Sequence, residues 1–396
     1  MTFHTTGLRA AIDGGDLAGA VTLVWRRGEI VQRTAEGWAD REAGRPMRGD
    51  SLFRIASMTK PITSALAMML VEEGALSLSD PITRWAPEFA EMRVLRSPTG
   101  PLDDTYTAAR PITVDDLLTH RSGLTYGFLA QGPIAGAYTE ALGSLLDSRL
   151  EPDAWIAALA RLPLACAPGE RFCYGHSTDL LGFILARIAG MDLAELMARR
   201  ILRPLGMADT GFAPPADDRA AVAYGVDEDG GLVAQPVPPR PAGTRFTSAG
   251  QGLWSTAGDY LTFARLLLGG GQVDGVRLLR QESVALMLAD SLAEPDRRAM
   301  LMGMPMFAGH GFGRGLAVVR DRDRAAPMLG TGRPGAFGWP GALWTWWQAD
   351  PAEEMILIWL VQNTTTPARL ASGKGLGAYM AQFSFERAAY GAFAGA

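Results

Sequence analysis

The sequence predicts an α/β fold in which an antiparallel sheet, built from both ends of the chain and flanked by helices, carries a large, mainly helical insertion. Strand-like segments occur near the two ends, whereas the middle of the chain shows mostly short helical patterns. With 396 residues and 48% hydrophobic content, the chain can bury a large core or two lobes. We therefore predict an α/β domain of residues 1–78 and 305–396 and a helical domain of residues 79–304, with the functional site in the cleft between them.

The N-terminal part predicts a short helix followed by a β-hairpin. Residues 8–12 have helical spacing, and the next two segments, 20–25 and 29–33, are rich in residues that favour strands. A tight turn at residues 26–28 joins these two segments. The hairpin would supply the N-terminal strands of the sheet.

A helix with one buried stripe is predicted directly after Lys60. Its apolar residues recur at the helical period and are Ile62, Ala65, Leu66, Met69 and Leu70. Gly74 marks the end of this helix. Ser57 and Lys60 are three residues apart at its start, so both side chains lie on one face. The amine could take the hydroxyl proton there, although the same spacing also fits a capping Ser beside a surface Lys.

The middle of the chain contains short helices with readable N-terminal caps. Thr113 precedes one helical segment, and Thr256 lies three residues before Asp259 at the start of another. Asp192 lies three residues before Glu195, which is the spacing of a capping box.

Near the C-terminus the period changes back to that of strands. Residues 316–320, 342–347 and 355–361 are the candidate strands, and residues 369–392 predict a terminal helix.

Composition and charge exclude several classes of function. The formal net charge is −5 with no basic stripe, so we expect no nucleic-acid partner and no anionic membrane partner. Residues 1–7 do not resemble a signal peptide, no apolar run approaches the ~18 residues of a membrane span, and we expect a cytoplasmic protein. The four histidines are scattered, so we expect no metal and no other cofactor. Cys166 and Cys173 could form a disulfide, but two reduced thiols are expected without an export signal.

Two segments carry a family resemblance. Residues 52–60 read Leu-Phe-Arg-Ile-Ala-Ser-Met-Thr-Lys, and residues 118–124 read Leu-Thr-His-Arg-Ser-Gly-Leu. Together they resemble the serine β-lactamase and penicillin-binding-protein superfamily, and more closely the family VIII carboxylesterases built on the class C β-lactamase plan. The resemblance runs from about Gly19 to the C-terminal helix, and it implies a serine β-lactamase-like fold that agrees with the pattern of elements.

The resemblance implies a second catalytic element at Tyr174-Gly175-His176, before an apolar helix that ends at Gly190. Tyr174 matches the tyrosine that handles a proton in the superfamily. His176 stands where β-lactamases have an Asn that helps to hold the substrate, so we assign it to substrate binding. Whether Lys60 or Tyr174 takes the proton of Ser57 is left open, and we treat the two as a coupled unit.

The third element of the superfamily, Lys-Thr-Gly, corresponds here to Trp339-Pro340-Gly341. Family VIII esterases commonly have Trp-Gly-Gly at this place, so Trp339 and Gly341 fit as substrate-binding residues and Pro340 is unusual. The N–H groups of Ser57 and Ala342 would form the oxyanion hole. Replacing the Lys by Trp removes a carboxylate anchor and adds an apolar wall, which favours neutral apolar esters over penicillin-type acids.

Several other residues have simpler interpretations. Arg314 and Arg333 lie near enough in sequence to replace the missing Lys, which we consider the weaker alternative. The stretch around Ser177 begins like a nucleophile elbow but lacks its final glycine, so Ser177 is predicted to be a helix N-cap. His120 is predicted to be a hydrogen-bonded structural residue and not the base of a Ser–His pair.

The resemblance therefore predicts a serine carboxylesterase that hydrolyses neutral short- to medium-chain carboxylic esters through an acyl-enzyme on Ser57. Its catalytic residues would be Ser57, Lys60 and Tyr174, and its partner a small-molecule ester. The alternatives are a β-lactamase, a D-amino-acid peptidase or amidase, acyl transfer to an alcohol, and a catalytically silent binding protein. The sequence leaves the oligomeric state open.

Overall fold

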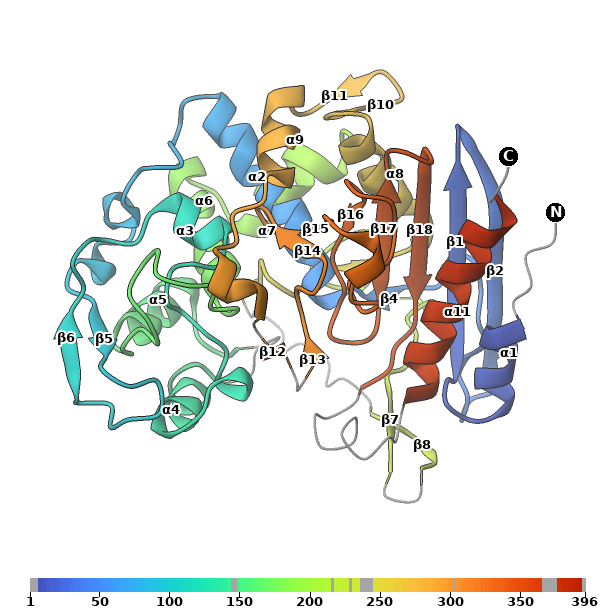
Figure 1. Ribbon diagram of the computed structural model, residues 1–396, viewed down its shortest axis with the longest axis horizontal. Helices are drawn as coiled ribbons and strands as arrows, with labels where there is room; N and C mark the ends of the chain where they lie inside the picture. Colours follow the sequence, from blue (N-terminus) through green and yellow to red (C-terminus); the bar gives the residue numbers. More distant parts are fainter. Residues whose placement is uncertain are drawn as a thin grey trace.

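The computed structural model describes residues 6–143, 148–214, 217–227, 230–235, 245–298, 300–301, 304–364 and 376–393. It confirms an α/β fold built around an antiparallel sheet (Figure 1). Within these residues the sheet has eight strands in the order β14-β15-β16-β17-β18-β1-β2-β3. Their bounds are Gly19–Arg26 (β1), Glu29–Asp40 (β2), Arg45–Pro46 (β3), His310–Phe312 (β14), Ala317–Val319 (β15), Phe337–Gly338 (β16), Trp346–Asp350 (β17) and Met355–Leu360 (β18).

The two ends of the chain meet at the centre of this sheet, as predicted. Strand β1 pairs antiparallel with β18, from Val21 opposite Leu360 to Arg26 opposite Met355. Because side chains alternate along a strand, the two faces of the pair enter two different hydrophobic clusters. A sheet that is buried on both faces needs helices on both sides.

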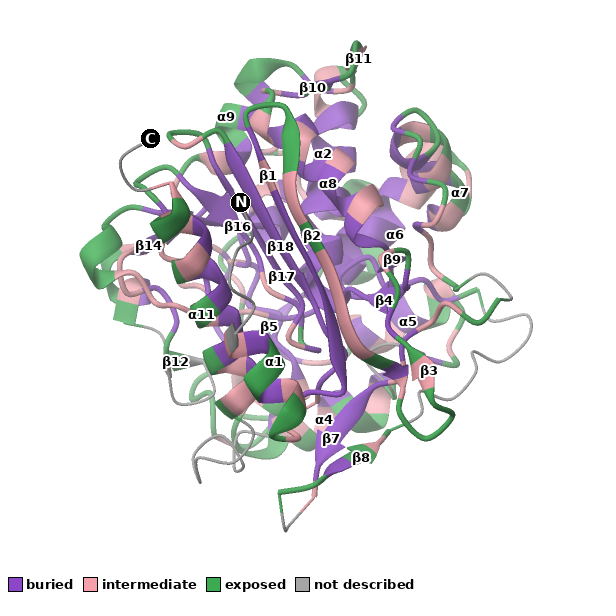
Figure 2. Cartoon of the chain, turned by 90° about the vertical axis from the view of Figure 1, so that its right-hand side faces the viewer, coloured by how far each residue is buried: buried purple, intermediate pink, exposed green. Residues whose placement is uncertain are grey.

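Helices supply that cover (Figure 2). Helix α1 (Thr6–Asp13) and helix α11 (Leu376–Ala392) contact each other on one face of the sheet. Helix α8 (Ala257–Leu268) packs against β1, β17 and β18 on the other face. Since α8 lies inside the range predicted for the helical domain, the helical period showed that it was amphipathic but not which partner it covers. The division into two domains stays a prediction.

The region between β3 and β14 contains most of the helices. They are α2 (Thr59–Glu72), α3 (Val114–Leu118), α4 (Pro133–Leu142), α5 (Pro152–Ala160), α6 (Ser177–Ala189), α7 (Leu193–Met197), α8 and α9 (Gln281–Leu288). Helix α6 packs on α2 and α3. Short antiparallel ribbons that the sequence did not predict lie among them, namely β4 (Phe53–Arg54) with β9 (Trp254–Ser255), β5 (Arg93–Leu95) with β6 (Thr105–Thr107), β7 (Tyr224–Val226) with β8 (Leu232–Ala234), β10 (Gln272–Val273) with β11 (Val276–Arg277), and β12 (Met300–Leu301) with β13 (Met304–Pro305).

Two predicted elements begin later than expected. Strand β17 starts at Trp346 and not at residue 342, because residues 341–344 form a turn in which Trp344 has φ 64° and its N–H donates to the carbonyl of Gly341. Helix α11 starts at Leu376, and the first seven residues of the predicted terminal helix lie outside the described residues.

Two of the three predicted caps are confirmed. Thr113 forms a capping box with Asp116, and the side chain of Thr256 accepts the N–H of Asp259. The capping box at Asp192 is wrong, since its side chain makes no cap hydrogen bond and its carboxylate lies 3.0 Å from the Arg245 guanidinium. A charge from another segment thus outweighed the local signal.

The two cysteines and the apolar segments complete the description of the chain. Cys166 and Cys173 are free thiols, with their Sγ atoms 2.9 Å apart. Among the described residues, no helix combines the length and the apolar character needed to cross a bilayer.

Candidate active site

The start of α2 presents Ser57 and Lys60 to the interior of the protein. A short 3-10 turn, Ala56–Met58, leads directly into α2. Ala56 has φ 45°, a left-handed conformation that is uncommon for a residue other than Gly and that makes the chain turn sharply at Ser57. Ser57 is 6% exposed and Lys60 is completely buried, so the pair lies in the interior and not on the surface.

All three donors of the Lys60 ammonium group have partners. Lys60 Nζ lies 3.1 Å from Ser57 Oγ, 3.0 Å from the carbonyl oxygen of Gly250 and 3.3 Å from the hydroxyl of Tyr126. A buried amine needs such partners, because an unpaired charge inside a protein is costly. These contacts fix Nζ beside the hydroxyl of Ser57.

Tyr174 contacts the same hydroxyl. Its phenolic O–H donates to Ser57 Oγ at 2.8 Å, and Lys60 Nζ lies 4.6 Å from the centre of its ring. The structure therefore brings Ser57, Lys60 and Tyr174 together. When either Lys60 or Tyr174 lacks its proton, its contact can reverse and accept the proton of Ser57.

Trp339 differs from the sequence expectation of an apolar wall. Its side chain is only 1% exposed, and its indole N–H donates to the Tyr174 hydroxyl at 3.1 Å. Its ring also packs edge-to-face on Phe312, with centroids 5.0 Å apart. Trp339 is thus a hydrogen-bond donor to Tyr174, and its predicted contact with substrate stays a prediction.

Gly341 and Ala342 lie next to the segment that carries Ser57. A Cβ atom on Gly341 would overlap the carbonyl oxygen of Ile55 and the hydroxyl of Thr345, so this place requires Gly. Thr345 Oγ1 also donates to Ile55 O at 3.2 Å. Ala342 follows as an exposed residue in the turn. The oxyanion hole of the Ser57 and Ala342 N–H groups stays a prediction that this close approach supports.

His176 is enclosed by aromatic rings. Its ring centroid lies 4.7 Å from that of Tyr126 and 5.5 Å from those of Tyr138 and Trp155, and the residue is 3% exposed. His176 Nδ1 lies 3.5 Å from a carboxylate oxygen of Asp179. The predicted contact of His176 with substrate stays a prediction, and what the structure records is a packing role behind Tyr126.

Asp179 is a buried carboxylate that the sequence analysis missed. Its Oδ1 accepts the hydroxyl of Ser248 at 2.6 Å and the N–H of Gly250 at 2.9 Å. Burial alone would raise the pKa of Asp179, but the contacts with His176, Lys60 and Ser248 outweigh burial and lower this pKa. Because the carbonyl of Gly250 accepts from Lys60, Asp179 positions one of the three partners of the amine.

Tyr126 was also missed. It lies two residues after the Leu-Thr-His-Arg-Ser-Gly-Leu stretch, and nothing in the sequence separated it from an ordinary core tyrosine. Burial, together with the nearby Asp179 and Tyr174, raises the pKa of Tyr126 well above its usual value, so it is a neutral phenol. It can orient Lys60 but is not a base.

Two of the simpler interpretations can be compared with the structure. His120 is completely buried, and its Nδ1 lies 3.4 Å from the N–H of Gly175, as expected for a structural residue. Burial and the nearby Lys60 hold the pKa of His120 well below its ordinary value. The N-cap prediction for Ser177 is wrong, because His176 occupies the cap position and Ser177 Oγ contacts Ser122 Oγ at 2.8 Å.

Both candidate replacements for the missing Lys are engaged elsewhere. Arg314 lies 2.7 Å from the carboxylate of Asp115, and Arg333 lies 3.0 Å from that of Glu353. Neither guanidinium is thereby left as a dedicated carboxylate anchor.

The geometry can be compared with known proteins. The sequence model of the family described as Beta-lactamase matches residues 8–379. The chain belongs to the β-lactamase family. Protein Rv1367c of Mycobacterium tuberculosis is 50% identical to this β-lactamase-family chain over 91% of it and 89% of the relative. Esterase EstB of Burkholderia gladioli is 35% identical over 88% of the chain and 86% of the relative.

A solved structure gives the same family and fold. EstCE1, described as a hydrolase with promiscuous acyltransferase activity, superimposes with a TM-score of 0.79 at 26% identity. The match covers 98% of this chain and 97% of that one. This β-lactamase-family protein is therefore a serine hydrolase whose relatives act in ester hydrolysis or acyl transfer.

Proposed function

We propose that this protein is a serine carboxylesterase that hydrolyses neutral short- to medium-chain esters through an acyl-enzyme on Ser57. The observation that carries the proposal is the double contact on Ser57 Oγ, from Lys60 Nζ at 3.1 Å and from the Tyr174 hydroxyl at 2.8 Å. A hydroxyl held between two proton-handling groups is the arrangement of an activated nucleophile. The relationship to EstB supports the choice of an ester substrate.

In this mechanism Ser57 Oγ bonds to the ester carbonyl carbon while its proton passes to the Lys60/Tyr174 unit. The carbonyl oxygen becomes an oxyanion that accepts the N–H groups of Ser57 and Ala342. The bond to the alcohol oxygen then breaks, the alcohol takes a proton from Tyr174, and the acyl group remains on Ser57. Water attacks this acyl group, passes a proton through the same unit back to Ser57 Oγ, and releases the carboxylic acid.

The preference for neutral esters rests on the charges near the site. The family's Lys is replaced by Trp339, and the guanidinium groups of Arg314 and Arg333 are paired with Asp115 and Glu353. A carboxylate on the substrate would therefore find no unpaired guanidinium at these two positions to compensate for its desolvation.

Hydrolysis of a p-nitrophenyl ester series beside a chromogenic cephalosporin tests this proposal. We expect ester turnover to peak at short or medium acyl chains and to exceed cephalosporin turnover. Ser57→Ala, Lys60→Ala and Tyr174→Phe should each abolish nearly all of it. Ser64→Ala is the matched control, because Ser64 is a buried serine on the same helix. Near-normal ester turnover in Lys60→Ala would refute the assignment of the base unit, and dominant cephalosporin turnover would refute the esterase.

Acyl transfer to an alcohol is the second candidate, and the description of EstCE1 favours it. Both activities share the acyl-enzyme and differ only in whether water or an alcohol attacks it. Product analysis with increasing butanol distinguishes them, since a transferase forms the butyl ester at the expense of the acid. A silent binding protein would leave Ser57 unlabelled by a phosphonate probe.

A further inference from the structure

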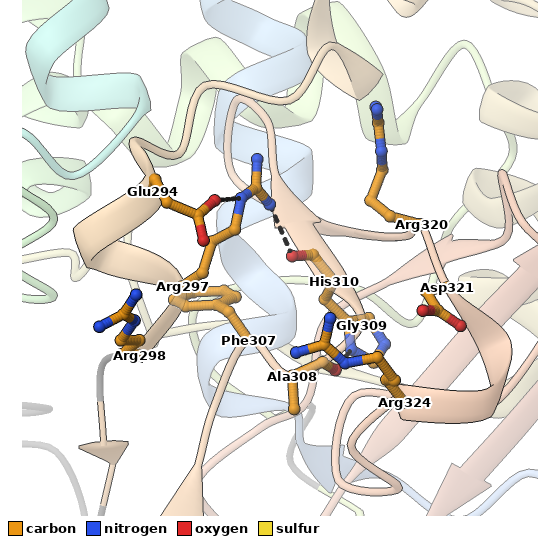
Figure 3. Close-up of a pocket in the computed structure, with 10 residues that line it drawn as sticks. All are labelled: Glu294, Arg297, Arg298, Phe307, Ala308, Gly309, His310, Arg320, Asp321 and Arg324. Carbon is orange, nitrogen blue, oxygen red and sulfur yellow. Dashed lines mark hydrogen bonds and ion pairs between the residues drawn. The ribbon is translucent and has the colours of Figure 1, made fainter.

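A cavity of about 390 Å³ has a lining that includes none of Ser57, Lys60 and Tyr174. Figure 3 shows the residues that form it. It is formed by the 3-10 segment Glu294–Arg298, the residues that lead into β14, and the chain that follows β15. Its lining residues come from three separate segments within residues 294–324, so the cavity exists only in the folded chain. Its volume is within the range of small-molecule sites.

Arginines dominate the lining of this cavity. Arg297, Arg298, Arg320 and Arg324 face it, against two carboxylates, Glu294 and Asp321. Figure 3 shows Arg298 on one side of the cavity and Arg320 and Arg324 on the other, with Arg297 and His310 between them. The cavity therefore has an excess of positive charge.

Two of the charged side chains around the cavity, those of Arg297 and Asp321, have partners within the protein. Arg297 is paired, with its guanidinium 2.7 Å from Asp290 and 3.3 Å from Glu294. The carboxylate of Asp321 caps the next turn by accepting the N–H of Asp323 at 3.1 Å.

The remaining guanidinium groups are those of Arg298, Arg320 and Arg324. In the part of the chain that the structure describes, no carboxylate lies within ion-pair distance of any of these three. Several like charges around one cavity create a positive potential that favours the binding of an anion there.

His310 fixes one wall of the cavity and offers no donor of its own. Its Nδ1 lies 2.9 Å from the carbonyl oxygen of Ala308, and its Nε2 lies 2.9 Å from that of Gly330. With both ring nitrogens engaged, the ring is not available as a metal ligand. A ligand here would be held by the guanidinium groups.

We propose that this cavity binds a small molecule through a dianionic oxyanion group, either a phosphate monoester or a dicarboxylate. Guanidinium groups present planar pairs of N–H donors that match the oxygens of phosphate and carboxylate. Two negative charges would balance the excess of positive charge around the cavity. The alternative is that these arginines are ordinary solvated surface residues, in which case no such anion binds.

The proposed anion site is separate from Ser57 but shares an aromatic wall with it. Phe307 lines the cavity and meets Phe172 edge-to-face at 5.0 Å, and Phe172 stacks on Tyr174 at 6.3 Å. Binding can therefore be measured without turnover, in the Ser57→Ala variant. Failure of this proposal and failure of the esterase are then distinguishable.

Isothermal titration calorimetry of Ser57→Ala with phenyl phosphate and with succinate, at low and at moderate salt, tests the proposal. We expect binding that weakens as salt rises. Adding Arg320→Ala and Arg324→Ala should weaken it by tenfold or more, because charge-assisted hydrogen bonds are lost. Adding Arg161→Ala and Arg199→Ala removes the same charge at exposed positions outside the cavity and should leave it unchanged.

Comparison of the affinities for the two anions shows which class of dianion the site binds. Tighter binding of phenyl phosphate assigns the site to phosphate monoesters, and tighter binding of succinate assigns it to dicarboxylates. Binding of neither anion would overturn the proposal. Equal affinity in the Arg320/Arg324 variant and its parent would overturn it as well. Because both arginines are exposed, their replacement should leave the thermal unfolding midpoint unchanged.

Discussion

Replacing Trp339 by Phe removes one hydrogen-bond donor from the oxygen of Tyr174 and keeps an aromatic ring in place. The indole N–H donates to that oxygen at 3.1 Å, and the same oxygen lies 2.8 Å from Ser57 Oγ. Trp339 is thus a positioning residue that acts through Tyr174. Its effect should appear in the chemical step more than in substrate binding.

The size of the effect follows from the kind of bond that is lost. A hydrogen bond to a group that carries charge during the reaction contributes about 1.5–3 kcal/mol. Since 1.4 kcal/mol corresponds to a factor of ten, kcat should fall about 10- to 100-fold while KM changes little.

The assay is p-nitrophenyl butyrate hydrolysis, from which kcat and KM are obtained separately, with Trp347→Phe as the matched control. Trp347 is completely buried, its ring meets that of Phe337, and it makes no contact with Tyr174. Both substitutions shorten a buried Trp, so both should lower the thermal unfolding midpoint. Only Trp339→Phe should lower kcat, because only Trp339 donates to the Tyr174 hydroxyl.

Two results would refute this reasoning. The first is a Trp339→Phe enzyme with kcat within twofold of the parent. The second is an equal loss of kcat in Trp347→Phe, which would trace the effect to packing alone.

Two further predictions concern stability and backbone fit. Burial raises the pKa of Glu386 from its ordinary 4.5 to about 7. The protonated carboxyl group therefore contributes its full stabilisation of the fold below about pH 4.5, and this contribution is lost as the pH rises through about 7. In urea unfolding, the free energy of unfolding of the parent should fall by about 3 kcal/mol across this pH range, and that of Glu386→Gln should not show this fall. Parallel plots of the free energy of unfolding against pH for the two proteins would disprove this. Gly341→Ala should lower kcat/KM about a hundredfold, because the added Cβ overlaps Ile55 O and displaces the chain beside Ser57. A kcat/KM equal to that of the parent in Gly341→Ala would show that the backbone around residue 341 can shift to accommodate the Cβ atom without disturbing Ser57.

The local sequence was sufficient for the start of α2 and for the sheet strands from both chain ends. Ser57 and Lys60 lie on one turn, so helix geometry alone places their side chains together. Strands β1 and β18 were predicted from residue type, because a buried strand needs little beyond a run of apolar and β-branched residues. The Tyr174 motif was recognised by resemblance, and the chain's own periodicity did not reveal it.

Only the tertiary structure decided which groups surround Lys60. Tyr126, the carbonyl of Gly250 and Asp179 behind it come from separate segments, and no local pattern marks a core tyrosine or a backbone carbonyl as a partner of an amine. The same limit explains Trp339, whose residue type predicted an apolar wall although its N–H donates to Tyr174. Local sequence patterns were enough to place Ser57 and Lys60 on one helical turn and to predict the strands. Contacts between distant segments set how the candidate catalytic groups are held, because side-chain partners depend on packing and not on the period of a helix or strand.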